Sequence, residues 1–519
     1  MMVRTGPTET TCQPILSAIC CCVQAMIRLL PYQTTTGRAM ETSRALLIGG
    51  RWQAAADGAA YEVVNPATEE VIGSAAQAGA PDVKAAIAAA EVGLASWRRT
   101  NPWVRSRVIR RISQIVEERR EEIARLVTIE VGKPIEQSRG EVQATWELFD
   151  WFADETRRIY GQVIEPRGTS GHQTVTFEPV GIVAAFTAWN FPVLLMSRKI
   201  APALAAGCSI ICRPAEEAPG AVLAIARCCL DAGVPPGVVN VLTGLPNAIT
   251  PAIMASPKVR KVTFTGSIPV GQMLMRQAAD TVKRVTMELG GHAPVIVHDD
   301  VDVTAAAHLS AVAKFRNAGQ VCASPTRFYV HESRVEAFAA AFSARAAALK
   351  VGDGLDPAND VGPLTTRRRR EAVEAMVEDA VAAGGKLAVG GRRPAQPNRG
   401  WFYEPTAVVG APEGARLMTE EPFGPVAAIS GFSRVEEALE RANGLEFGLA
   451  AYVFTNSLKR AHETSEALQA GVVCVNTYVA ALAETPFGGT KQSGFGREGG
   501  ALGIRDYLDA KFTNMAFLQ

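Results

Sequence analysis

The chain has 519 residues, of which 48% are hydrophobic and 20% charged, and its formal net charge is +1. This balance is typical of a globular enzyme with two or three domains, and it gives no basic surface for nucleic acid. We therefore expect a small-molecule ligand and neither nucleic acid nor a membrane as partner. The ten cysteines form no disulfide framework in a chain this long, which favours a reducing, cytoplasmic compartment. None has metal-ligand spacing with histidines nearby, so we expect no metal.

Residues 1–39 differ in composition from the rest of the chain. They hold three arginines against one acid, Glu9, and one mostly apolar stretch at 15–27. The stretch is short for a membrane span, and no cleavage site of small residues follows it. Residues 1–39 are either a targeting segment or the product of an upstream start codon with no structural role. We favour the second explanation. The globular part then begins near Met40, with a strand and turn predicted at 47–52.

Helical spacing of apolar residues predicts helices at 83–97 and 104–131. Residues 161–179 are polar, rich in β-formers and punctuated by Gly and Pro, so we expect an extended hairpin there. The four arginines at 367–370 run directly into Glu371. Such a run is more typical of a solvated helix start than of a binding patch.

From residue 181 onward, short apolar strands alternate with helices. The predicted strands are 181–186, 209–212, 238–242 and 261–264, and the predicted helices between them include 193–206 and 221–232. Four parallel strands with intervening helices predict a dinucleotide-binding sheet. The alternation resumes at 294–297, after Gly290 and Gly291, where we expect a second α/β domain.

The expected fold class is therefore α/β, with a dinucleotide-binding parallel-sheet domain, an α/β catalytic domain and a small β oligomerisation arm. The predicted limits are 40–160 and 180–289 for the first, 290–495 for the second, and 161–179 with 496–519 for the arm and C-terminal strand.

A thiol and a carboxylate stand in two separate motifs, R-N-A-G-Q-V-C at 316–322 and M-E-L-G-G-H at 287–292. Cys322 can attack a carbonyl carbon, and Glu288 can activate the water that releases the acyl group. Asn190 follows a predicted strand and can donate amide N–H groups to an oxyanion, together with the Cys322 backbone N–H. Each residue alone has a common structural explanation, and the combination indicates covalent catalysis.

Candidate cofactor contacts stand after two further strands. Gly266 and Ser267 open a predicted helix, and a helix N-terminus suits a pyrophosphate, although such a turn is often only a cap. Arg213 and Glu216 follow the strand at 209–212. An acid there can accept hydrogen bonds from ribose hydroxyls and would repel a 2′-phosphate, while the alternative is a surface charge pair. The G-x-G-x-x-G match at 494–499 has no predicted strand before it and is rejected as a phosphate loop.

These motifs together resemble the aldehyde dehydrogenase superfamily over nearly the whole chain from about Leu47. The matching stretches are T-A-W-N-F-P (187–192), P-A-L-A-A-G-C (202–208), F-T-G-S (264–267), M-E-L-G-G (287–291), G-Q-V-C (319–322), E-P-F-G-P (421–425) and P-F-G-G (486–489). The resemblance implies that Cys322 is the nucleophile, Glu288 the general base and Asn190 the oxyanion donor. It implies cofactor contacts by Trp189, Arg213, Glu216, Gly266, Ser267, Glu421 and Phe423, the last two at the nicotinamide ribose and ring.

The resemblance also implies NAD as cofactor, with NADP as the alternative. Arginine, which keeps the charge but differs in shape, stands at 213 where most members have lysine, and Glu216 favours NAD. Arg198 and Arg316 resemble the pair that grips the distal carboxylate of a short semialdehyde in the succinate-semialdehyde dehydrogenase branch. The loop V-A-A-L-A at 479–483 lacks the serine that this branch often carries, so a more apolar aldehyde is an alternative substrate.

The same residues also bear on other functions. A dehydrogenase that transfers its acyl group to coenzyme A would not need Glu288, and a structural protein of this fold should lack the nucleophile or the base. A cofactor-independent thioesterase or esterase could use Cys322 and Glu288, but would not need Glu216, Ser267 and Glu421. The arm and the C-terminal strand predict a homodimer or a homotetramer, because an unpaired apolar strand favours association.

Overall fold

The computed structural model describes residues 43–168 and 171–516. The expected extension at 1–39 lies outside the described residues.

An eight-stranded sheet carries the predicted dinucleotide-binding strands. Its parallel strands are β12 (Arg284–Glu288), β11 (Val259–Thr265), β8 (Ile182–Phe186), β9 (Ser209–Arg213) and β10 (Val239–Val241), in that order. The antiparallel strands β2 (Leu46–Ile48), β3 (Arg51–Gln53) and β20 (Gly494–Phe495) complete its two edges. Strands β8 to β11 confirm the four predicted strands, and β12 was not predicted.

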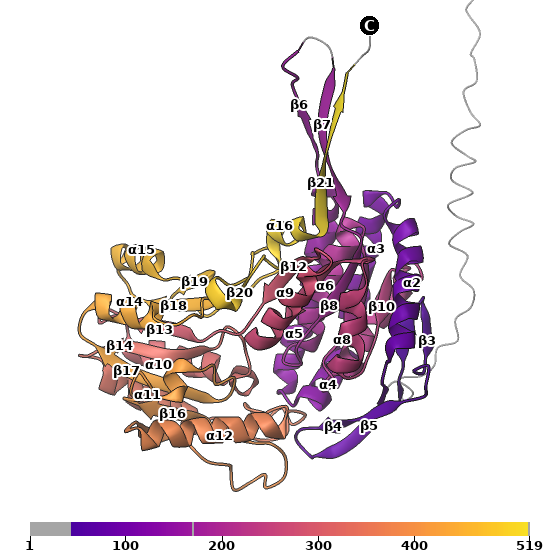
Figure 1. Ribbon diagram of the computed structural model, residues 1–519. Helices are drawn as coiled ribbons and strands as arrows, with labels where there is room; N and C mark the ends of the chain where they lie inside the picture. Colours follow the sequence, from indigo (N-terminus) through magenta and orange to yellow (C-terminus); the bar gives the residue numbers. More distant parts are fainter. Residues whose placement is uncertain (1–42, 169–170, 517–519) are drawn as a thin grey trace, which may run out of the picture. The chain divides into compact units, whose positions relative to one another are not determined.

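Helices cover both faces of this sheet (Figure 1). One layer holds α2 (Ala80–Trp97), α8 (Pro246–Ala255) and α9 (Ile268–Ala279), and the other holds α6 (Pro192–Ala206) and α7 (Pro219–Asp231). Outside α6 and α7 lie α3 (Pro102–Glu118), α4 (Arg120–Val131) and α5 (Ile135–Glu155). Because both faces are covered, the strands β8 and β9 are buried along their whole length.

The single helix predicted at 104–131 is wrong. The structure has two helices there, α3 and α4, because Arg119 leaves helical geometry with φ −101° and ψ 17°. The Arg119 guanidinium forms an ion pair of 2.6 Å with Asp231 at the end of α7. The break lets α4 pack on both α5 and α7.

A second, seven-stranded sheet follows in sequence. Its order is β15 (Lys386–Val389), β16 (Thr406–Val409), β17 (Val426–Phe432), β14 (Pro325–His331), β13 (Ala293–Val297), β18 (Ala450–Phe454) and β19 (Val472–Val475). All its pairings are parallel except that of β15 with β16. The helices around it include α10 (Val303–Phe315), α11 (Val335–Ala347), α12 (Arg367–Ala382), α14 (Val435–Asn443) and α15 (Leu458–Ala467). Two mostly parallel sheets confirm the expected α/β class.

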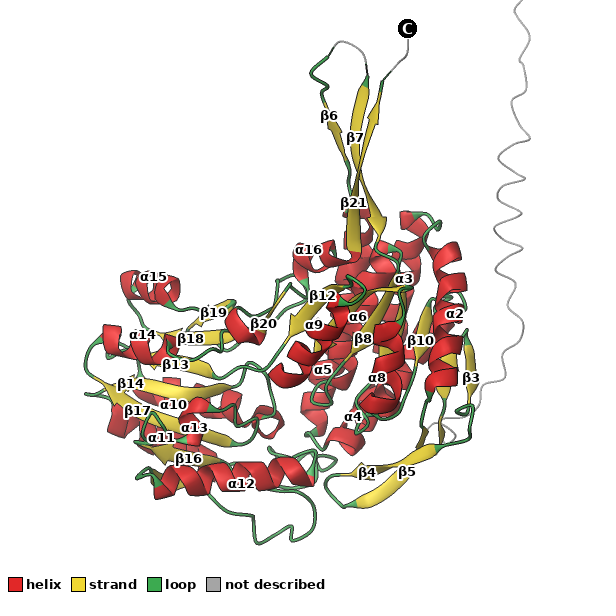
Figure 2. Ribbon diagram, in the orientation of Figure 1, coloured by secondary structure: helices red, strands yellow, loops and turns green. Residues whose placement is uncertain are grey.

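A three-stranded sheet contains the predicted hairpin. β6 (Gln162–Ile164) pairs antiparallel with β7 (His172–Pro179), and β21 (Leu508–Met515) pairs along the whole length of β7 (Figure 2). A separate small sheet is formed by β1 (Ser43–Arg44), β4 (Ala60–Asn65) and β5 (Glu70–Ala76). The sequence-based limits of the domains stay a prediction, and β20 shows that residues 494 and 495 belong to the first sheet although the predicted second domain includes them.

Candidate active site

Four of the predicted site residues lie at the carboxyl ends of adjacent strands of the first sheet. In the order of the sheet, Glu288 ends β12, Gly266 follows β11, Asn190 follows β8, and Arg213 ends β9. The register places Glu288 beside Thr265 and Phe186 beside Arg213. Ligands bind at this edge in open parallel sheets, because the helix N-termini and the loops after the strands converge there.

Cys322 lies on a strained loop between α10 and β14 of the second sheet. Asn317 and Ala318 have φ of 49° and 51°, and Gly319 continues the left-handed run with φ 72°. Residues other than glycine adopt this conformation at a cost and only where the surroundings enforce it. A Cβ on Gly319 would collide with the carbonyl of Gly424, so the loop packs too closely there for any other residue.

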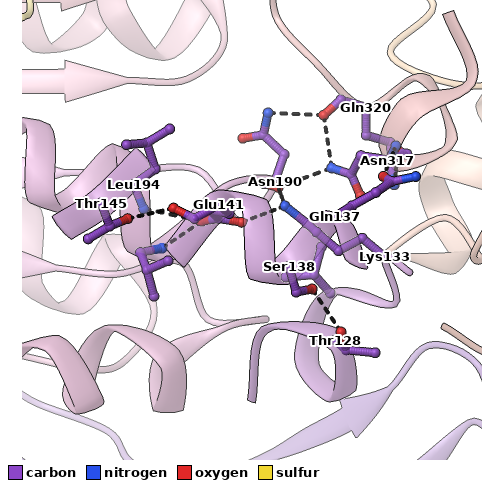
Figure 3. Close-up of polar contacts among 12 residues, drawn as sticks. Thr128, Lys133, Gln137, Ser138, Glu141, Thr145, Asn190, Leu194, Asn317 and Gln320 are labelled. Atoms are coloured by element: carbon purple, nitrogen blue, oxygen red, sulfur yellow. Dashed lines mark hydrogen bonds and ion pairs between the residues drawn. The ribbon is translucent and has the colours of Figure 1, made fainter. Parts of the chain in front are cut away.

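A buried hydrogen-bond network holds this loop against Asn190 (Figure 3). The Asn190 amide donates to the Gln320 carbonyl at 3.0 Å, and the Asn317 amide donates to the Asn190 carbonyl at 3.0 Å. The Asn317 backbone N–H donates to the Gln137 side chain at 2.7 Å. The network therefore fixes Asn190 relative to the loop that carries Cys322.

Lys133 and Glu141 support the same network from behind. The Lys133 ammonium donates to the Asn190 carbonyl at 2.7 Å and to Glu141 at 2.6 Å. Glu141 also accepts the backbone N–H groups of Val193 and Leu194, at 3.0 and 3.2 Å. It thus caps helix α6, which has no hydrogen-bonding cap of its own.

A cavity of about 940 Å³ joins the strand ends of the first sheet to the Cys322 loop. The predicted residues that line it are Trp189, Asn190, Arg198, Gly266, Ser267, Glu288, Arg316, Cys322, Glu421 and Phe423. Arg213 and Glu216 are absent from its lining. Of the twelve predicted site residues, ten line this one cavity. The other two, Arg213 and Glu216, lie farther along the edge of the first sheet.

The thiol and the general-base candidate both resist ionisation in this cavity. Burial raises the pKa of Cys322 to about 12, and the carboxylates of Glu288 and Glu421 add to that effect. Burial also raises the pKa of Glu288 well above its ordinary value, with a further contribution from Glu498. Neither oxygen of Glu288 has a hydrogen-bond partner in the described chain. A carboxyl group in this state can take a proton from water once it ionises.

Glu498 and Lys199 lie next to Glu288 and were missed by the sequence analysis. Lys199 is fully buried and pairs with Glu498, and it donates to the Thr265 hydroxyl at 2.7 Å. Glu498 also lines the cavity. The available signal was Lys199 itself, a second cation beside Arg198 in an otherwise apolar helix. Glu498 lies in the rejected glycine motif, and nothing in the sequence links it to Glu288.

The donor set fits a dinucleotide cofactor. Ser267 precedes α9, its hydroxyl caps no backbone N–H of that helix, and it lines the cavity with Gly266. Glu421 accepts the Gly291 N–H at 3.1 Å, and burial raises its pKa to about 7. The rings of Trp189 and Phe423 meet edge to face with their centroids 5.6 Å apart. Hydroxyl and helix N–H donors suit a pyrophosphate, and a carboxylate suits ribose hydroxyls.

Arg213 and Glu216 bind each other at the end of β9. The Arg213 guanidinium is buried, forms an ion pair with Glu216, and donates from Nη2 to the Gly244 carbonyl at 3.0 Å. Glu216 is half-buried. The pair partly neutralises the acid that the sequence analysis expects to repel a 2′-phosphate.

The two arginines predicted for the substrate both face the cavity. The Arg198 guanidinium lies over the Phe487 ring at 5.6 Å, and its Nη1 is buried without a hydrogen-bond partner. The Arg316 guanidinium lies over the Phe191 ring at 5.2 Å and is exposed toward the cavity. Both cations can therefore receive an anion that enters the cavity.

Comparison with known proteins settles the family. The family model described as "Aldehyde dehydrogenase family" matches residues 52–513. The chain belongs to the aldehyde dehydrogenase family. It is an oxidoreductase that acts on aldehydes and uses a nicotinamide cofactor, NAD or NADP.

Curated members of the family cover most of the chain. The mitochondrial succinate-semialdehyde dehydrogenase of Arabidopsis thaliana is 42% identical over 90% of this chain and 88% of its own length. The NADP(+) succinate-semialdehyde dehydrogenase GabD of Escherichia coli K12 is 40% identical over 90% of this chain and 96% of its own. The crystal structure of a succinate-semialdehyde dehydrogenase from Burkholderia pseudomallei superimposes with a TM-score of 0.91. It is 40% identical, and the match covers 93% of this chain and all of that one.

Across residues 43–168 and 171–516, no three metal-ligating side chains gather in one place. In the same segments, no helix combines the length and the apolar composition that crossing a membrane requires.

Proposed function

We propose that this aldehyde dehydrogenase oxidises a short aldehyde with a carboxylate at its far end, such as succinate semialdehyde. The observation that carries the proposal is the position of Arg198 and Arg316, two cations in the same cavity as Cys322. The Nη1 group of Arg198 is buried and lacks an acceptor in the described chain. A substrate carboxylate would supply that acceptor and would set the distance from its anchor to the aldehyde carbon.

The proposed reaction begins at Cys322. The thiol proton passes to water, and the thiolate attacks the aldehyde carbon. This forms a thiohemiacetal whose oxyanion accepts hydrogen bonds from the Asn190 amide and the Cys322 backbone N–H. One amide hydrogen of Asn190 is bound to Gln320, which leaves the second for the oxyanion. No described residue accepts the Cys322 backbone N–H.

Collapse of the thiohemiacetal expels a hydride from the former aldehyde carbon and leaves a thioester on Cys322. When bound, the nicotinamide ring is the hydride acceptor. Glu288 then takes a proton from water, the resulting hydroxide attacks the thioester, and the carboxylic acid leaves as the sulfur is released. Glu421 and Phe423 would hold the nicotinamide end of the cofactor, and Gly266 and Ser267 the pyrophosphate.

NAD is the cofactor that we propose. Glu216 would meet the adenosine ribose and repel a 2′-phosphate, with Arg213 beside it. NADP is the alternative, and its support is the ion pair of Glu216 with Arg213, which weakens that repulsion.

A second candidate function is the oxidation of neutral aldehydes over a broad range. It is favoured by the apolar side chains of Val479, Ala480 and Ala481, which line the cavity and form no polar contact for a charged substrate. The two candidates differ in one respect only, which is whether the arginines contribute to substrate binding.

The deciding experiment measures the reduced cofactor by absorbance, with succinate semialdehyde against butanal, each with NAD and with NADP. Replacing Arg316 or Arg198 by alanine should lower kcat/KM for the semialdehyde at least about 30-fold, roughly 2 kcal/mol, and leave butanal turnover in place. The matched control is Arg157→Ala, because that guanidinium also lies over a ring, Trp103 at 5.0 Å, but outside the cavity. Equal turnover of both aldehydes would favour the broad enzyme, and reduction of neither cofactor would contradict the proposal.

We further propose a homodimer or homotetramer formed through the three-stranded sheet. Val163, Phe512 and Met515 on this sheet are exposed by 75%, 58% and 48%, which leaves apolar area for a second subunit. Sedimentation should show the oligomer, and Phe512→Glu should shift it toward monomer.

A cytoplasmic location is the last part of the proposal. The six cysteines of the described chain are all free, which supports a reducing compartment. Cell fractionation would test it.

A further inference from the structure

Helix α12 begins with four consecutive arginines, which the sequence analysis expects to be a solvated helix start. The structure gives two of them ordinary partners. Arg367 is 73% exposed and pairs with Glu371 at 2.8 Å. Arg370 is buried and donates to the Gly400 carbonyl at 2.9 Å. These two arginines face solvent and the neighbouring loop.

The other two arginines face the cavity that contains Cys322. Arg368 and Arg369 line it together with Thr366 and Ala372, because residues three and four apart share one face of a helix. No hydrogen bond or ion pair joins the Arg368 side chain to any residue of the described chain. The Nε of Arg369 is buried and likewise lacks a partner there. Arg368 is exposed at the rim of the cavity, whereas the buried Nε of Arg369 is costly without an acceptor. Two neighbouring guanidinium groups of this kind indicate an anionic ligand.

The opposite wall of the cavity indicates which part of the ligand the two arginines would bind. Gly266 and Ser267 line it at the start of α9, where a pyrophosphate fits. Burial raises the pKa of Glu421, the candidate for the nicotinamide ribose, and the positive charge of Arg369 is near enough to oppose that shift. Burial and Glu216 raise the pKa of Glu217, and Arg368 is near enough to oppose that shift. Glu217 is the neighbour of Glu216, the candidate for the adenosine ribose. Arg369 is thus near the candidate for one ribose, and Arg368 is near the acid beside the candidate for the other.

We propose that Arg368 and Arg369 bind the cofactor pyrophosphate from the side of the second sheet, opposite the N-terminus of α9. The proposal rests on the proposed function, because it needs a dinucleotide in the cavity. Each guanidinium can donate two parallel N–H groups to phosphate oxygens. We propose Arg198 and Arg316 for the substrate carboxylate. The two pairs of arginines would therefore bind different anions. The cofactor would then be held from two opposite walls of the cavity.

The test measures cofactor binding without an aldehyde. Isothermal titration compares NAD, NADP and ADP-ribose, and adenosine serves as the ligand without phosphate. Arg368→Gln and Arg369→Gln should each weaken binding of the three phosphate-bearing ligands about tenfold, and the double variant by more. Adenosine affinity should not change. Arg367→Gln is the matched control, since it removes a charge from the same run on the solvent side, and it should leave every affinity unaltered.

Three results would overturn the proposal. One is unchanged ADP-ribose binding in the double variant. Another is a loss restricted to NADP, which would assign the arginines to a 2′-phosphate. The third is an equal loss in Arg367→Gln, which would indicate a general charge effect. Arg369→Lys, which retains the charge, should recover part of the affinity and guards against loss through misfolding, which circular dichroism would also reveal.

Failure of this proposal is distinguishable from failure of the proposed function. If aldehyde oxidation is absent but ADP-ribose binds and depends on Arg368 and Arg369, the function is wrong and the pyrophosphate contact stands. If succinate semialdehyde is oxidised and the double variant binds all ligands as the unaltered protein does, the contact is wrong and the function stands.

Discussion

Lys133 and Glu141 form an ion pair of 2.6 Å in which both side chains are fully buried. The remaining partners of the pair connect it to the site, because Lys133 donates to the Asn190 carbonyl and Glu141 caps the helix that follows. Burial lowers the pKa of Lys133 to about 8, although Glu141 opposes the shift. The pair thus holds the backbone of the oxyanion donor directly, without lining the cavity itself.

Replacing Lys133 by methionine should destabilise the protein by about 3 kcal/mol or more, because it leaves the Glu141 charge buried and unpaired. The activity that survives should show a reduced kcat with little change in KM for the cofactor, since Asn190 loses its support. Thermal unfolding and steady-state kinetics measure the two effects. The matched control is Lys258→Met, which breaks an exposed pair with Glu91 of 2.7 Å and should cost about 1 kcal/mol or less. Equal losses in the two variants would contradict this account of Lys133.

Glu288→Gln should separate the two halves of the proposed reaction. Attack by Cys322 and hydride loss do not need the carboxylate, whereas hydrolysis of the thioester does. Rapid mixing should therefore give one equivalent of reduced cofactor per site, followed by turnover slower than that of the unaltered enzyme by about 100-fold or more. Mass spectrometry of the quenched protein should find the acyl group on Cys322. A variant that turns over at the normal rate would assign the base to another residue.

Gly488→Ala should slow the same step through geometry. A Cβ at Gly488 would stand 2.7 Å from Oε1 of Glu288 and 2.6 Å from the Gly496 carbonyl. Because the backbone cannot give way easily, the Glu288 side chain must turn, and we expect kcat to fall about tenfold or more. Gly414→Ala is the control, since a Cβ there meets nothing within 4 Å. Steady-state kinetics with both variants measure the difference, and a normal kcat in Gly488→Ala would show that Glu288 has freedom to move.

The reactivity of Cys322 should rise steeply with pH. Burial raises the pKa of its thiol to about 12, so the thiolate is a minor species near neutrality. Alkylation by iodoacetamide in the absence of cofactor should therefore accelerate about tenfold for each pH unit between pH 7 and 10. Quantifying the peptide that contains Cys322 by mass spectrometry provides the rate. A plateau below pH 8 would show that the thiol is already ionised there.

The same measurement tests the electrostatic effect of Glu288 on Cys322. An ionised Glu288 disfavours the neighbouring thiolate, so its removal should lower the pKa of Cys322. Burial raises the pKa of Glu288 itself, and the carboxyl is neutral at low pH. Glu288→Gln should thus match the unaltered protein at low pH and be alkylated faster once Glu288 would have ionised. Slower alkylation of the variant at high pH would reverse the sign of this interaction.

Glu216→Gln should shift cofactor preference toward NADP. The substitution removes the negative charge that disfavours a 2′-phosphate and leaves Arg213 without its ion-pair partner, free to attract that phosphate. We expect the ratio of kcat/KM for NADP to that for NAD to rise about tenfold, or about 1.4 kcal/mol. An unchanged ratio would place the adenosine ribose elsewhere. Glu217→Gln tests the specificity of the effect, because it removes a neighbouring acid that has no bond to Arg213.

The sequence by itself determined the α/β class, four of the five parallel strands of the first sheet, and the family. Strong apolar runs with helices between them leave few alternatives to a parallel sheet, because each strand must be buried on both faces. The motifs around Cys322, Glu288 and Asn190 stand at strand ends and loops, where local sequence identifies them. Ten of the twelve proposed site residues line one cavity, because the strand ends and loops that carry most of these motifs meet there.

Only the tertiary structure decided which charged residues face that cavity. Arg368 and Arg367 are neighbours in one run, yet one faces the site and the other solvent, because helix α12 presents a single face to the cavity. Lys199 and Glu498 are 299 residues apart, and Lys133 lies 57 residues from Asn190, so no local pattern relates them. Arg213 and Glu216 form an ion pair with each other and do not line the cavity. Such pairings depend on distances between segments that pack only after the chain has folded.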